Sequence, residues 1–134
     1  MFNLKNKYKG SEFYEFGMRD ITYNLNETNP AISIQIGHYN SDEIIQIHFS
    51  EVYHHSIMTE SFIWFVEEEN WDEDIFIAKA KNSQLIKWLS TYSLLGSETV
   101  VKPKDLDHYR VYTQDHFVEV LTSVKPKISF QNKT

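Results

Sequence analysis

The sequence has 134 residues, a formal net charge of −6 and 41% hydrophobic residues. This length and apolar content suit one folded domain over residues 1–134 and exclude a disordered chain. The lack of cysteine excludes disulfide bonds and thiolate metal sites, and the negative charge opposes binding to nucleic acid or to anionic membranes.

The first half of the chain shows the alternation of apolar and polar residues that is typical of β-strands. Residues 11–25 are aromatic and lack helical periodicity, which predicts one or two strands near a sheet edge. Residues 31–39 and 43–54 each alternate, and the polar turn between them predicts a hairpin. A bulge or bend at residues 50–52 fits the second segment as well as a continuous strand does. The apolar positions of this pair are Ile32, Ile34 and Ile36, then Ile45, Ile47 and Phe49.

The middle of the chain contains a further strand and the best helix. Residues 61–68 form a continuous apolar run of strand length, which is typical of a central strand covered on both faces. Residues 74–81 fit either a strand or the lead-in to a helix. Residues 83–95 have an apolar stripe, with Asn82 or Ser83 as a capping residue and Gly96 at the C-terminal end. The stripe consists of Leu85, Ile86, Trp88, Leu89 and Tyr92.

The last part of the chain again favours strands. Residues 108–124 divide around Gln114, Asp115 and His116 into two apolar runs, which predicts a second hairpin, although residues 115–124 also fit a short helix. Residues 126–130 predict an edge strand that begins after a proline. The expected fold is therefore α+β: a mainly antiparallel sheet of about six strands with one principal amphipathic helix (about 83–95) packed on one face.

An acidic stretch with a tryptophan lies between two aromatic runs. Its residues are Glu67, Glu68, Glu69, Trp71, Asp72, Glu73 and Asp74. The simplest interpretation is a solvated loop. A calcium site is disfavoured because the spaced carboxylates and the glycine of an EF-hand loop are missing. The third interpretation is a docking surface for a basic protein, in which the carboxylates steer association and Trp71 acts as an anchor.

The histidines do not form a recognisable metal or catalytic motif. The weak candidates for a His/carboxylate site are His48, Glu51 and His54, which lie close together in the sequence. No His-Glu-x-x-His pattern, Gly-x-Ser-x-Gly elbow or glycine-rich phosphate loop occurs. We therefore expect no cofactor, no metal and no catalytic residues.

Two aromatic clusters, at residues 12–16 and 62–65, suit either a ligand pocket or the core. Charge, size and the lack of catalytic motifs favour a non-catalytic, acidic, cytoplasmic protein that binds a basic protein partner, as an inhibitor or immunity-type protein does. The alternative is a small-molecule-binding protein or hydrolase with a His/carboxylate site between sheet and helix. A subunit that dimerises through an edge strand is a third possibility, and the sequence leaves the oligomeric state open.

Overall fold

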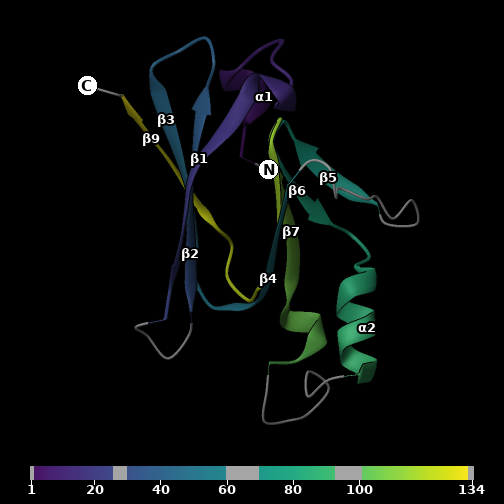
Figure 1. Ribbon diagram of the computed structural model, residues 1–134. Coiled ribbons are helices and arrows are strands. Elements are labelled where there is room, and N and C mark those ends of the chain that lie inside the picture. Colours follow the sequence, from purple (N-terminus) through teal and green to yellow (C-terminus); the bar gives the residue numbers. More distant parts are fainter. Residues whose placement is uncertain (1, 26–29, 60–69, 93–100, 133–134) are drawn as a thin grey trace.

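The computed structural model describes residues 2–25, 30–59, 70–92 and 101–132, which form two antiparallel sheets with short helical elements beside them (Figure 1). The strands are β1 (Phe16–Asn24), β2 (Ala31–His38), β3 (Glu43–Phe49), β4 (Val52–Thr59), β5 (Trp71–Asp74), β6 (Ile77–Ala80), β7 (Asp107–Tyr112), β8 (His116–Thr122) and β9 (Lys127–Asn132). The helical elements are α1 (Leu4–Lys7), α2 (Gln84–Tyr92) and the 3₁₀ turns η1 (Phe13–Glu15) and η4 (Pro103–Asp105).

The strands divide into a four-stranded sheet of order β1-β2-β3-β9 and a five-stranded sheet of order β4-β8-β7-β6-β5. The chain leaves the first sheet between β3 and β4, where Glu51 adopts a positive φ of 51°. It returns between β8 and β9. The two crossings allow β9, from the end of the chain, to pair with β3 in the first sheet.

The inner faces of both sheets contribute to one hydrophobic cluster. Alternate residues of β2 and β3 supply Ile32, Ile34, Ile36, Ile45, Ile47 and Phe49, and the facing strands supply Ile77, Tyr109, Val111, Val118 and Val120. Ring contacts cross the interface, with centroids 5.7 Å apart for Phe49 and Tyr109 and 4.9 Å apart for Phe16 and Phe76. The predicted buried faces of the first hairpin are therefore confirmed.

The α+β class is confirmed in its coarse form, since the described residues are mainly antiparallel strands with one main helix. The prediction of about six strands in one sheet is inexact, because the described residues contain nine strands in two sheets. The difference begins in residues 43–54, where the chain bends between β3 and β4 and does not continue as one strand. The positive φ of Glu51 ends β3 and sends the chain into the second sheet.

Residues 74–81 fitted either a strand or the lead-in to a helix. In the structure they include strand β6, which pairs with β5 in a hairpin. Helix α2 begins where the sequence predicts, with the Ser83 hydroxyl oxygen accepting the Ile86 N–H at 3.1 Å. Its C-terminal end and Gly96 lie outside the described residues, as does the strand expected at residues 61–68.

The C-terminal predictions are confirmed. Strands β7 and β8 form the second hairpin, so the helical alternative for residues 115–124 is wrong. Strand β9 forms an edge of the four-stranded sheet, and β1 forms the other. No helix in the described part of the chain is both long and apolar enough to cross a membrane.

Candidate functional site

The outer face of the five-stranded sheet carries an unusual set of polar and aromatic side chains. Because Tyr109 and Val111 of β7 point into the core, their neighbours His108 and Arg110 lie on the opposite face. Arg110 is directly across from Glu119 on β8, and β5 lies at the edge beyond β6. Polar, charged and aromatic side chains from several strands therefore meet on this face.

Arg110 lies at the centre of this face and is buried. Its Nε donates to Oε1 of Glu119 at 2.9 Å. The guanidinium carbon is 4.0 Å from the ring centroid of Trp71 and 5.0 Å from that of Phe117. A cation stacked between two aromatic rings and paired with a carboxylate is stabilised by cation–π attraction as well as by the ion pair.

His108 links Glu119 to the helix. Its Nε2 is 3.3 Å from Oε1 of Glu119, and its Nδ1 is 2.7 Å from the hydroxyl oxygen of Ser83. Burial would raise the pKa of Glu119, but the hydrogen bonds and charges of His108 and Arg110 outweigh it, so this pKa lies below its usual value. An ionised carboxylate only accepts hydrogen bonds. Nε2 of His108 therefore donates to Glu119, and the hydroxyl of Ser83 is the hydrogen-bond partner of Nδ1.

The Ser83, His108 and Glu119 chain has the residue types of a catalytic triad, but its geometry fits a structural link better. The ring of His108 is 1% exposed, and the Ser83 oxygen also accepts the N–H of Ile86 as the helix cap. A nucleophile must reach a substrate, whereas the Ser83 hydroxyl and the His108 ring connect the start of α2 to the sheet. Sequence analysis missed this link because its members lie far apart along the chain.

The weak catalytic candidates do not form one site. His48 lies on β3 of the four-stranded sheet, where its Nδ1 is 2.8 Å from the hydroxyl of Ser33. Glu51 lies at the crossing between sheets and accepts a hydrogen bond from Ser123. His54 lies on β4 of the other sheet, and burial, followed by the charges of nearby histidines, lowers its pKa against the opposing effect of Glu119.

The acidic stretch is only partly described. Glu67, Glu68 and Glu69 lie outside the described residues, whereas Asp72 and Glu73 on β5 are exposed. Trp71 is half-buried, and its ring meets that of His108 edge-on with centroids 5.0 Å apart. Trp71 thus belongs to the group of side chains around Arg110, together with His108, Phe117 and Glu119.

Asp74 lies in the interior although it belongs to the same acidic run. Its side chain accepts the backbone N–H groups of Phe2, Leu4 and Lys5 at 2.9, 3.2 and 3.1 Å. Leu4 and Lys5 belong to the first turn of α1, where N–H groups have no partner within the helix, and Phe2 lies just before it. Asp74 therefore fixes the N-terminal segment to the five-stranded sheet and is not available to a partner.

A surface aromatic cluster lies near the exposed carboxylates of β5. The ring of Phe13 meets the rings of Tyr14 and Tyr112 edge-on, with centroids 5.7 and 5.3 Å away. Burial and then the charge of Glu73 raise the pKa of Tyr112. Glu73 pairs with Ala78 and Ala78 with Arg110, so Glu73 lies on the same outer face of the sheet as Tyr112. Phe13 and Tyr14 are 39% and 55% exposed. The sequence signals these two residues in the aromatic run 12–16, but it does not signal Tyr112.

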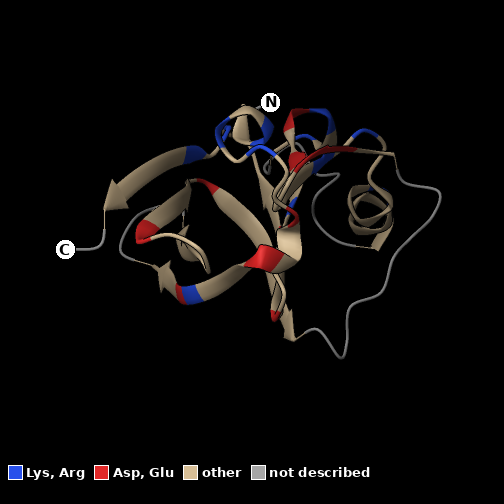
Figure 2. Cartoon of the chain, turned by 90° about the horizontal axis from the view of Figure 1, so that it is seen from above, with Lys and Arg blue, Asp and Glu red and all other residues tan. Residues whose placement is uncertain are grey.

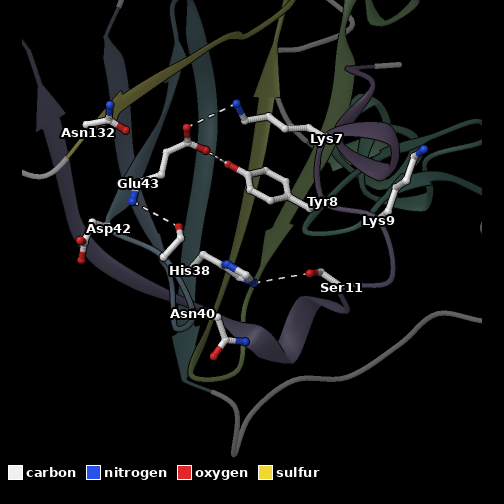
Figure 3. Close-up of a pocket in the computed structure, with 10 residues that line it drawn as sticks. Lys7, Tyr8, Lys9, Ser11, His38, Asn40, Asp42, Glu43 and Asn132 are labelled. Atoms are coloured by element: carbon white, nitrogen blue, oxygen red, sulfur yellow. Dashed lines mark hydrogen bonds and ion pairs between the residues drawn. The ribbon is translucent and has the colours of Figure 1, made fainter.

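A pocket of about 720 Å³ lies between α1 and the turn that joins β2 to β3 (Figure 3). In it, the Tyr8 hydroxyl donates to Glu43, and the Lys7 ammonium lies 3.4 Å from the same carboxylate. The hydroxyl of Ser11 is 3.4 Å from Nε2 of His38. The charges of Lys7 and Glu43 thus pair with each other, which favours a role in attaching α1 to the first sheet.

In the parts of the chain that the structure describes, no group of three or more His, Cys, Asp or Glu side chains is arranged so that it could hold a metal ion. Comparison with known proteins gave no match to a family model, to a curated protein or to a solved structure. The function of this chain is therefore inferred from its own geometry.

Proposed function

We propose that this protein is a non-catalytic binding protein whose partner is a basic protein, acting in the manner of an inhibitor or immunity-type protein. The observation that supports this proposal is the ring cluster of Phe13, Tyr14 and Tyr112, in which Phe13 and Tyr14 are exposed and which shares its sheet face with Glu73. Aromatic residues are enriched at the energetic centres of protein interfaces. Carboxylates next to them make the surface favour a positively charged partner.

The charge distribution supports a basic partner. The chain has a formal net charge of −6, and Asp72 and Glu73 are exposed at the edge strand β5. Seen from the end at which α1 lies, several of the basic segments are close to the N-terminus, and acidic segments recur across the rest of the view (Figure 2). A net negative charge attracts basic proteins over several ångströms and raises association rates.

The proposed surface differs from the one expected from the sequence alone. The expected surface ran continuously over residues 67–74, with Trp71 as the anchor. In the proposed surface, Asp72 and Glu73 keep their steering role, and Phe13 and Tyr14 replace Trp71 as the exposed aromatic anchors.

The test compares two double variants that change the net charge equally. The purified protein is used to capture partners from native cell extract, and the affinity of a retained basic protein is then measured by calorimetry. In Asp72→Asn/Glu73→Gln we expect about a tenfold loss of affinity, because two interfacial carboxylates are removed. The control, Asp20→Asn/Asp42→Asn, neutralises two exposed carboxylates associated with the four-stranded sheet. Equal losses in both variants would contradict a defined surface on β5.

The pocket beside α1 supports a second candidate, a small-molecule-binding protein. Its volume of about 720 Å³ lies in the range of ligand sites, and it contains both His38 and Glu43. A thermal-shift screen against small polar metabolites tests this candidate. A ligand whose stabilising effect is lost in His38→Ala would support it over the protein-binding proposal.

A further inference from the structure

Two cations of this chain are held in the same way, each against aromatic rings and a carboxylate. The first is Arg110, with its guanidinium carbon 4.0 Å from the Trp71 centroid and 5.0 Å from the Phe117 centroid. Its Nε donates to Glu119 at 2.9 Å. This arrangement is buried, so the cation is largely removed from water.

The second cation is Lys7 of α1. Its ammonium nitrogen lies 4.2 Å from the ring centroid of Phe130 and 5.7 Å from that of Tyr8. The same nitrogen is 3.4 Å from an oxygen of Glu43. Although this site is closer to the surface, it repeats the combination of rings and a carboxylate.

The surface cluster provides a third set of rings and a carboxylate. Phe13, Tyr14 and Tyr112 supply the rings, and the strand register places Glu73 on the same outer face of the sheet as Tyr112. The charge of Arg110 also acts on Tyr112, but its guanidinium is stacked on other rings. No Lys or Arg from the described ranges makes a cation–π contact with these three rings.

We propose that an arginine side chain of the basic partner occupies this third site, stacked on the exposed rings of Phe13 and Tyr14 and paired with Glu73. This inference depends on the proposed function and specifies how the partner is recognised. A guanidinium is planar and more weakly hydrated than an ammonium, so it stacks on aromatic faces at a smaller desolvation cost. Its fork of donors also suits a carboxylate. Arg110, the most buried cation among the described residues, is held in that way.

The experiment uses two probes of equal charge, N-acetylated hexa-arginine amide and hexa-lysine amide, with the full chain at fixed ionic strength. Binding is measured by calorimetry and by the NMR signals of the tyrosine rings. We expect hexa-arginine to bind about fivefold more tightly than hexa-lysine, because only the guanidinium stacks well on the rings. We also expect it to shift the ring signals of Tyr14 and Tyr112.

Substitutions then separate ring stacking from charge. Tyr14→Leu keeps an apolar side chain but removes the ring, so we expect the preference for arginine to fall to about twofold or less. Tyr92→Leu is the matched control, because Tyr92 is 73% exposed but lies on α2, and it should leave the preference unchanged. Phe13→Leu serves as a second ring variant, and near-ultraviolet circular dichroism confirms that each variant is folded.

The possible results distinguish this inference from the proposed function. Equal binding of both peptides, with loss of both in Asp72→Asn/Glu73→Gln, would overturn arginine recognition while the acidic docking surface stands. An unchanged arginine preference in folded Tyr14→Leu and Phe13→Leu would also overturn it. Failure of both peptides to bind would count against the inference and the proposed function together.

Discussion

The guanidinium carbon of Arg110 lies 4.0 Å from the centroid of the Trp71 ring. Trp71 is on the edge strand β5 and Arg110 is on β7, with β6 between them. Their contact therefore ties the edge of the five-stranded sheet to its interior. This relationship gives Trp71 a structural role, and its role as an anchor for a partner stays a prediction.

The first prediction concerns Trp71→Ala. The substitution removes the ring from Arg110 and from His108, so we expect the free energy of unfolding to fall by about 2 kcal/mol. Urea denaturation followed by circular dichroism measures the change. Trp88→Ala is the control, because Trp88 on α2 is 58% exposed, and it should change stability by no more than about 0.5 kcal/mol. Similar losses in both variants would contradict the structural role of Trp71.

The second prediction concerns Asp74→Asn. The neutral amide keeps the size of the side chain but weakens its hydrogen bonds to the N–H groups of Phe2, Leu4 and Lys5. We expect a loss of about 2 kcal/mol, because hydrogen bonds to a charged group are stronger than neutral ones. Hydrogen exchange measured by NMR should also show faster exchange of the Leu4 and Lys5 amides.

Asp72→Asn is the matched control for Asp74→Asn, since both aspartates lie on β5 and only Asp72 is exposed. Its effect on stability should be within about 0.5 kcal/mol. If Asp74→Asn were equally neutral and left amide exchange unchanged, the attachment of the N-terminal segment would not depend on this carboxylate.

The strand pattern of the first sheet could be predicted from the sequence because one face of each strand is buried. Alternation at Ile32, Ile34 and Ile36 follows directly from packing against the second sheet. The division into two sheets could not be predicted in this way. It depends on the backbone conformation of Glu51, and nothing in the alternation on either side of that residue indicates a left-handed position.

The candidate site was less predictable than the fold because its contacts join distant parts of the chain. Asp72 and Asp74 look alike in the sequence, but only Asp74 meets the backbone of residues 2–5. Phe13 meets Tyr112 across almost 100 residues. Sequence patterns are limited to neighbouring residues, so they reveal an acidic or aromatic run. They do not show which residues of that run are covered by a distant segment of the chain.

The third prediction concerns the link between α2 and the sheet. Ser83→Ala removes the helix cap and the hydrogen bond to Nδ1 of His108. We expect a loss of about 1.5 kcal/mol, because a cap is removed and the buried Nδ1 loses its partner. Thermal unfolding measures the change. Ser90→Ala is the control, since Ser90 only donates to the carbonyl of Ile86 within the helix and should change stability by no more than about 0.5 kcal/mol.

The third prediction also tests whether the Ser83, His108 and Glu119 chain is structural. A structural link requires that Ser83→Ala lowers stability and leaves any ester-hydrolysing activity of the preparation unchanged. If Ser83 reacted with a fluorophosphonate probe and this labelling required His108, the chain would have a catalytic role instead.

The fourth prediction concerns the pH dependence of stability that arises from Glu119. Its pKa in the folded protein lies below its ordinary value of 4.5, because the hydrogen bonds and charges of His108 and Arg110 outweigh the opposing effect of burial. Below pH 4.5 the unfolded chain therefore binds more protons at this residue than the folded one. Its stabilising contribution is complete above about pH 4.5 and is lost as the pH falls through the folded pKa.

Glu119→Gln should therefore lower the free energy of unfolding by about 3 kcal/mol at pH 7, because the buried Arg110 loses its carboxylate partner. The difference from the wild type should shrink below pH 4.5. His54→Gln is the comparison. Burial lowers the pKa of His54 from 6.5, so the contribution of His54 to the free energy of unfolding is lost as the pH falls below 6.5. Chemical denaturation at a series of pH values measures both. A difference between wild type and Glu119→Gln that stayed constant below pH 4.5 would mean that Glu119 is not held ionised by His108 and Arg110.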